Sequence, residues 1–419
     1  MPSFQATVAF LGALLIAGAL ISGLAQRSFV SLAALFVLAG FAVGDGGFQW
    51  ISFKAQSGFV RDLAFVALIV ILFRDGLEVE GEMLQSAWHL PLRKLGVAMP
   101  LTAGIVAVAA HLLIGLSWDE SLLLGALLSP TDPVLSSNIV TNPRVPRLIR
   151  HSLNLESGLN DGLALPAVLV FLAALQADSQ HFVWWRFILQ DIGLGLLYGL
   201  AMGWLAALLM PDESSRDLEH PIPSHQKSLY ALGVAFATYG VTVLFPPGNG
   251  FIAVFVAAIV LGVRRPDLRR HFEQRADEIV EIVKLGIFVV FGSLLTLDAL
   301  TSEGWPALAL VAATFLIARP LAVWIALTGT STDPQTRLFM GWFGPKGIAT
   351  MTFSLLVLDQ RIASGQRIFD LAALVVFCSI ILHGLTDTPG ANWIIRHAQR
   401  ASEKADRSRT IGQARSKST

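Results

Sequence analysis

The sequence has little charge and a single cysteine. Asp, Glu, Lys and Arg make up only 14% of its 419 residues, whereas 54% are hydrophobic and the mean hydropathy is +0.63. This balance is typical of a membrane protein and not of a soluble globular one. Because Cys378 stands alone in an apolar stretch, an intrachain disulfide and a thiolate metal cage are both excluded. The formal net charge is zero, and no nucleic-acid partner is expected.

Apolar stretches close to the length of about 20 residues that crosses a bilayer recur along nearly the whole chain. They leave no room for a soluble domain of ordinary size. Residues 1–9 contain no Lys or Arg, and no small-residue cleavage site follows, so we expect the first span to remain as a helix. We predict about thirteen spans, near residues 4–24, 28–43, 59–73, 92–116, 121–138, 153–176, 187–210, 226–245, 251–263, 279–297, 307–328, 336–358 and 368–387.

The Lys and Arg residues between these spans lie almost all on the side of the C-terminal tail. Because cytoplasmic connections are enriched in such residues, we expect a cytoplasmic C-terminus and an outside N-terminus. The multi-pass protein is then expected in a plasma membrane, such as the inner membrane of a bacterium. The basic tail, residues 391–419, is expected to be disordered.

Two of the predicted spans contain sequence that a regular helix avoids. The fifth contains "SPTDPV" at 129–134, where two prolines remove backbone donors, and the twelfth contains "GPKGIA" at 344–349. Paired interrupted helices, one in each half of a chain, indicate an inverted-repeat transporter with its site at the crossing. We therefore predict an all-α polytopic fold, with inverted repeats and two interrupted helices that cross at mid-membrane.

The head of the sixth span, "LNLESGLNDGLALP" at 153–166, is polar on one side. At 100° per residue its four polar residues fall within about 140° of one another on a helix. Charged residues inside a membrane span usually face a water-filled cavity or a partner. These four residues, Glu156, Ser157, Asn160 and Asp161, are therefore candidates for an ion site.

We assign different roles to the two carboxylates of this helix. Asp161 is predicted to bind the transported cation or a proton, and Glu156 to hold a basic partner. Asp132 in the first break is predicted to cap the second half of its own span and to contribute to the ion site, with Thr131 offering an oxygen ligand. Hard monovalent cations require such oxygen ligands, so the predicted cation ligands are Asp161 and Asp132, supported by Asn160, Thr131 and Ser157.

Several other ionisable residues lie within or beside the spans. Arg319 and Lys346 are predicted to pair with Glu156 or to compensate helix dipoles, with Lys346 as a second candidate for a titrating group. Asp75 is a candidate for a cytoplasmic funnel. Glu78, Glu80 and Glu82 are interpreted as a solvated face, and Lys284 and His383 as packing groups.

These motifs closely resemble those of monovalent cation/proton antiporters of the NhaP type. The matching stretches are "SPTDPV" at 129–134, "ESGLNDG" at 156–162, "ARPL" at 318–321 and "GPKGIA" at 344–349. The family often has an arginine where this chain has Lys346, and an acidic residue where this chain has Arg74.

The resemblance implies the architecture and several residue roles. It implies a homodimer in which a core domain, residues 92–176 and 306–390, moves against an interface domain, residues 1–91 and 177–305. It also implies that Asp161 carries the ion, that a core arginine holds Glu156, and that Asn160 goes with electroneutral exchange. No cofactor is implied, because the substrates are the transported ions.

The predicted function is secondary antiport of a monovalent cation, Na⁺ in the first place, against H⁺ at Asp161. Exchange of K⁺, or of Na⁺, K⁺ and Li⁺ together, is the alternative within transport, since oxygen ligands alone do not fix ion size. A cation channel is disfavoured because no repeated filter loop is visible. An intramembrane hydrolase with Asp132 and Asp161 as a dyad is disfavoured because no protease motif accompanies them. We therefore expect a transporter and not an enzyme.

Overall fold

The computed structural model describes most of the chain after the first span. The described residues are 32–51, 53–54, 57–79, 89–132, 137–176, 184–211, 222–275 and 277–416, with a few isolated residues between 9 and 20. Within them the regular elements are all helices, as predicted. The first predicted span falls almost entirely outside the described residues, so the count of thirteen stays a prediction.

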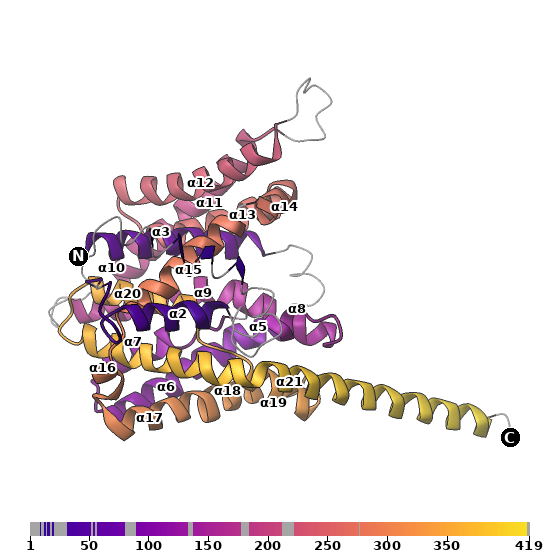
Figure 1. Ribbon diagram of the computed structural model, residues 1–419. Helices are drawn as coiled ribbons and strands as arrows, with labels where there is room; N and C mark the ends of the chain where they lie inside the picture. Colours follow the sequence, from indigo (N-terminus) through magenta and orange to yellow (C-terminus); the bar gives the residue numbers. More distant parts are fainter. Residues whose placement is uncertain are drawn as a thin grey trace.

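Each of the other predicted spans corresponds to a helix or to a set of consecutive helices (Figure 1). Six of the described helical segments are long and apolar enough to cross a membrane, and three shorter apolar helices accompany them. The main elements are α2 (Leu32–Val43), α3 (Gly58–Leu77), α5–η1–α6 (His89–Ile114), α7 (Trp118–Leu127), α8 (Ser137–Thr141), α9 (Arg147–Gln176), α10–η3–α11 (Trp184–Leu209), α12 (Ser224–Leu244), α13 (Gly250–Arg264), α14 (Pro266–Arg275), α15 (Asp277–Ser293), α16 (Leu297–Thr301), α17–η4–α18 (Gly304–Ala326), α19 (Pro334–Trp342), α20 (Ile348–Asp359) and α21 (Gly365–Ser416).

Both predicted helix breaks are present. Helix α7 ends at Leu127 and is followed by an irregular stretch, and residues 343–347 separate α19 from α20. The two breaks meet, because the backbone N–H of Asp132 donates to the carbonyl of Pro345 at 2.8 Å. The structure therefore confirms the crossing of two interrupted helices.

Three glycines on α11 allow this helix to pack closely against α13. A Cβ atom at Gly195, Gly199 or Gly203 would lie 2.6–2.9 Å from a backbone carbonyl oxygen of α13 or of its N-cap residue. The four-residue spacing thus provides a flat face for helix contact, as small residues do in membrane proteins. Helices α11, α12 and α13 lie on one side of the molecule, and α6, α17 and α18 lie on the opposite side (Figure 1).

Helix α21 continues to Ser416 and extends away from the body of the molecule (Figure 1). Residues 391–416 are rich in Ala and Arg, which favour helix. The disorder expected for residues 391–419 stays a prediction.

Candidate functional site

Helix α9 carries the polar face that the sequence predicts. Its residues Glu156, Asn160 and Asp161 are 3%, 2% and 5% exposed. The helix packs against α3, α7 and α8. Three polar side chains of one helix are therefore enclosed by neighbouring helices, where each must find a partner or bind a ligand.

Asn160 connects this helix to the first break. Its side-chain amide donates to the carbonyl oxygen and to the hydroxyl of Thr131, both at 2.9 Å. Because the amide nitrogen of Asn160 points to Thr131, its Oδ1 atom points away from Thr131. Among the described residues, no group donates to this oxygen or to Oδ1 of Asp161.

Two buried oxygens without a donor are well suited to a cation or a proton. A buried acceptor that lacks a hydrogen bond is unfavourable by about 1–3 kcal/mol, so a ligand that satisfies it gains that amount. Asn160 and Asp161 are consecutive and present one such oxygen each. This pair therefore fits the hard oxygen ligands that a monovalent cation requires.

The two breaks cap each other. Asp132 accepts a hydrogen bond from the backbone N–H of Ile348 at 3.2 Å, so its carboxylate lies at the N-terminus of α20. The ammonium of Lys346 donates to the carbonyls of Ser129 and Pro130 at 3.2 and 3.1 Å, just beyond the C-terminus of α7. Each charge lies at the helix end whose dipole it compensates.

This geometry adds a contact that the sequence did not predict. Asp132 caps α20 in the other broken span, and its capping of the second half of its own span stays a prediction. The start of the second half of its own span falls in residues 133–136, outside the described residues. The crossing brings the N-terminus of α20 to Asp132. This contact cannot be predicted from the order of residues along the chain.

Gly347 permits the close approach of the two breaks. A Cβ atom at this position would lie 2.3 Å from Oδ2 of Asp132 and 2.4 Å from its Cβ. We expect Gly347→Ala to separate the breaks and to lower the stability of the protein by about 1–3 kcal/mol. Thermal unfolding of the purified protein in detergent would measure the loss. Gly240→Ala on α12 is the control, because nothing lies within 4 Å of its added Cβ; equal melting of both variants would contradict the prediction.

Glu156 lies between two buried cations. Arg319 donates to Oε1 and Oε2 of Glu156 at 3.0 and 3.3 Å, which matches the predicted pairing with a core arginine. Lys94 lies 2.5 Å from Oε2 and also donates to the hydroxyl and the carbonyl of Ser152. A Cβ at Gly344 would overlap the Arg319 guanidinium, so the second break also makes room for this pair.

Lys94 is a residue of the site that the sequence analysis did not identify. Its side chain is completely buried in η1 of the fourth span. The available signal was its position inside the predicted span 92–116, where a lysine needs an acidic partner. Helix α9 provides that partner in Glu156.

Asp75 lies deeper than predicted. Its side chain is only 7% exposed, because α3 packs against α9 and α13 and continues to Leu77. Its backbone carbonyl oxygen would lie 3.8 Å from a Cβ atom at Gly158, so Asp75 lies beside the helix that carries Asp161. The interpretation of Lys284 as a packing group stays a prediction.

The glutamates that follow α3 are only partly described. Glu78 forms an ion pair with Arg74 at 2.8 Å, and its side chain is about one-third exposed, in agreement with the predicted solvated face. Glu80 and Glu82 lie outside the described residues.

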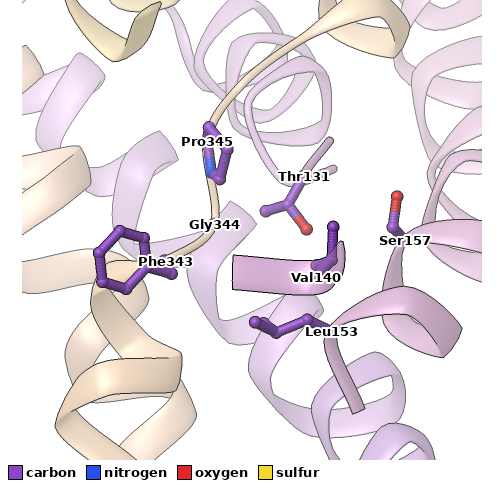
Figure 2. A pocket seen from close by; sticks show the side chains of 7 residues that line it. All are labelled: Thr131, Val140, Leu153, Ser157, Phe343, Gly344 and Pro345. Atoms are coloured by element: carbon purple, nitrogen blue, oxygen red, sulfur yellow. The ribbon is translucent and has the colours of Figure 1, made fainter. Parts of the chain in front are cut away.

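A small pocket with about 240 Å³ of empty space opens beside the crossing (Figure 2). Its polar lining comes from Thr131 and Ser157, and its apolar lining includes Leu153 and Phe343. Figure 2 shows Phe343 and Ser157 on opposite sides of this space, with Thr131 between them. Of the predicted site, the structure thus brings Thr131 together with both Asn160 and Ser157.

Two crossing interrupted helices with enclosed charges at the crossing define a secondary transporter of the inverted-repeat class. The sequence profile of the family described as "Sodium/hydrogen exchanger, transmembrane" matches residues 12–393. The chain therefore belongs to the sodium/hydrogen exchanger family, whose members are transporters and not enzymes.

Individual relatives are similar over most of the chain. The K⁺/H⁺ antiporter NhaP of Alkalimonas amylolytica is 26% identical over 94% of this chain and 68% of its own length. The K⁺/H⁺ antiporter NhaP2 of Shewanella sp. strain ANA-3 is 28% identical over 91% of this chain and 66% of its own length. The probable Na⁺/H⁺ antiporter 2 of Methanocaldococcus jannaschii is 25% identical over 70% of this chain. The chain thus spans about two thirds of the length of the first two relatives.

The fold also matches a solved structure. The sodium proton antiporter MjNhaP1 of M. jannaschii superposes with a TM-score of 0.79 over 94% of this chain and all of that chain, at 18% identity. At this identity the likeness shows the fold, and it confirms the predicted antiporter architecture.

Proposed function

We propose that this protein exchanges a monovalent cation for H⁺ at Asp161. The observation that carries the proposal is the pair of enclosed oxygens on Asn160 and Asp161 that receive no hydrogen bond from the described residues. A cation or a proton would satisfy the Asp161 oxygen, and the two cannot occupy it together. Competition for one carboxylate is sufficient to couple the two fluxes in opposite directions.

The neighbouring carboxylates support this role. Asp75 and Asp132 are both buried, Asp75 beside α9 and Asp132 next to the residue that accepts hydrogen bonds from Asn160. Carboxylates close to one another repel unless a proton or a cation lies with them. We infer that Asp75 is a second acidic group of the ion site, in place of the cytoplasmic funnel residue suggested by the sequence.

We infer that the core, residues 92–176 and 306–390, moves against the interface domain, residues 1–91 and 177–305. The ion pairs of Glu156 with Lys94 and Arg319, and the contacts between the two breaks, all lie within the inferred core. Asp75 and Lys284 belong to the interface domain, so movement would change their distances to Asp161. Alternating exposure of Asp161 to the two sides of the membrane would follow from this movement.

Na⁺ is the first candidate for the transported cation, in line with the family described as a sodium/hydrogen exchanger. K⁺ is the second candidate, because the relatives that cover more than nine tenths of this chain are named K⁺/H⁺ antiporters. Oxygen ligands of the kind found here accept either ion. Replacement of a proton by one such ion makes the exchange electroneutral, and we propose this stoichiometry.

We further propose a homodimer in a plasma membrane, with the C-terminus in the cytoplasm. Most of the α10–α11 surface is apolar and not covered by the chain itself, since only 22% of the most apolar stretch of Trp185–Leu209 is buried. Lipid and a second copy of the chain are the occupants that such a surface accepts.

Reconstitution in liposomes tests this proposed function. Liposomes with an internal pH dye would receive gradients of Na⁺, K⁺ or Li⁺, with the membrane potential either clamped or free. We expect each transported cation to drive proton movement at a rate that does not depend on the potential. Cation flux without proton movement would favour a channel, and dependence on the potential would contradict the electroneutral stoichiometry.

A further inference from the structure

The second break is held at both edges by one helix. The N-terminal edge is the carbonyl of Trp342, the last residue of α19, and it lies 3.0 Å from Nε2 of His383 on α21. Near the C-terminal end of the irregular stretch, the backbone N–H of Lys346 donates to Oγ of Ser379 at 2.7 Å. Ser379 and His383 are one helical turn apart on α21, and both side chains are completely buried.

The hydrogen bonds of these residues form a continuous chain. A carbonyl only accepts, so Nε2 of His383 carries the hydrogen that Trp342 receives. The same rule applies to Nδ1, which lies 2.9 Å from the Ser379 carbonyl, one turn back on the same helix, and 3.2 Å from the Ser379 hydroxyl. That hydroxyl oxygen accepts from the backbone N–H of Lys346 and so connects the histidine ring to the break.

Packing alone does not account for a histidine here. The ring centroid lies 5.4 Å from that of Phe315, 5.6 Å from that of Trp342 and 6.4 Å from that of Phe343. An aromatic hydrocarbon ring would suit these neighbours, and burial of imidazole among them is unfavourable unless its nitrogens are hydrogen-bonded. The polar atoms therefore act on the break and not on the packing.

The series of hydrogen bonds continues from the second break to the ion site. The Lys346 ammonium holds the carbonyls of Ser129 and Pro130 in the first break. The next residue, Thr131, receives both amide hydrogens of Asn160. A displacement of the Lys346 backbone would therefore be transmitted to the ligands that surround the transported ion.

We propose that His383 and Ser379 are positioning residues for the ion site. They fix both edges of the second break and, through Lys346, the backbone of the first break. This inference rests on the proposed function, because it assigns them a role in the affinity for the ion that Asp161 binds. Neither residue contacts the ion in this arrangement.

Substitution of these residues tests the inference. His383→Phe keeps an aromatic ring and removes both hydrogen bonds, Ser379→Ala removes the acceptor for Lys346, and His383→Gln keeps a donor for the Trp342 carbonyl. We expect His383→Phe and Ser379→Ala to raise the apparent KM for Na⁺ or K⁺ about three- to tenfold, the effect of losing one buried hydrogen bond. His383→Gln is expected to restore part of the affinity.

Control variants separate this role from a general loss of folding. A purely structural role would lower the amount of folded protein, and hence the maximal rate, without a change in KM. Thr242→Val on α12 removes a completely buried hydroxyl that donates to the carbonyl of Thr238 at 2.7 Å and touches neither edge of the break, and we expect a wild-type KM. The double variant His383→Phe/Ser379→Ala should raise KM by less than the product of the two single effects, because both act through one chain of hydrogen bonds.

The outcomes distinguish this inference from the proposed function. A wild-type KM in His383→Phe and in Ser379→Ala, together with no exchange in Asp161→Asn, would overturn the inference and leave the function intact. Exchange by Asp161→Asn at the wild-type rate would overturn the function itself. An equal rise of KM in Thr242→Val would also overturn the inference, because the effect would then not depend on the break.

Discussion

Asp161→Asn is expected to abolish coupled exchange while the protein remains folded. Asparagine keeps the size of the side chain but removes the negative charge, so neither a cation nor a proton can neutralise the site. Removal of one partner from a buried charge pair is unfavourable by about 3–5 kcal/mol, which corresponds to about a hundredfold to a thousandfold loss of cation affinity. Proton flux driven by Na⁺ or K⁺ in liposomes is the measurement.

Asp370→Asn is the matched control for this charge removal. Asp370 lies on α21 away from the crossing, where the Gln366 amide donates to it at 2.8 Å. We expect this variant to exchange ions at close to the wild-type rate. Loss of exchange in both variants would mean that the assay reports general damage and not a specific carboxylate.

The pattern of breaks and spans was readable from the sequence because it depends on local chemistry. Proline and glycine interrupt a membrane helix wherever they occur in this density, and the apolar runs on each side define its length. The polar face of α9 follows in the same way from the spacing of Glu156 and Asp161. These features need no knowledge of which helices become neighbours.

The partners across the crossing were not readable in this way. Lys94 and Glu156 are far apart in the sequence, and only the packing of the fourth span against α9 brings them together. The sequence left both Arg319 and Lys346 as possible partners of Glu156. In the structure Arg319 takes this role, while Lys346 caps α7 in the other break. The choice depends on three-dimensional packing and not on residue type.

Glu156→Gln is expected to lower stability more than any other single change at the crossing. The substitution leaves the ammonium of Lys94 and the guanidinium of Arg319 buried without their shared counter-charge, at side-chain exposures of 0% and 5%. Breaking a buried ion pair in this way is unfavourable by about 3–5 kcal/mol. Thermal unfolding of the purified protein in detergent would show the loss as a lower Tm.

The charge balance of this cluster can be tested by a second substitution. Lys94→Met alone leaves Glu156 paired with Arg319, so it should be less harmful than Glu156→Gln. The double variant Glu156→Gln/Lys94→Met removes one of the two unpaired cations, and we expect its Tm to lie above that of Glu156→Gln. If the double variant were less stable than the wild type by the sum of the two single losses, Lys94 and Glu156 would act independently, and the ion pair would not stabilise the core.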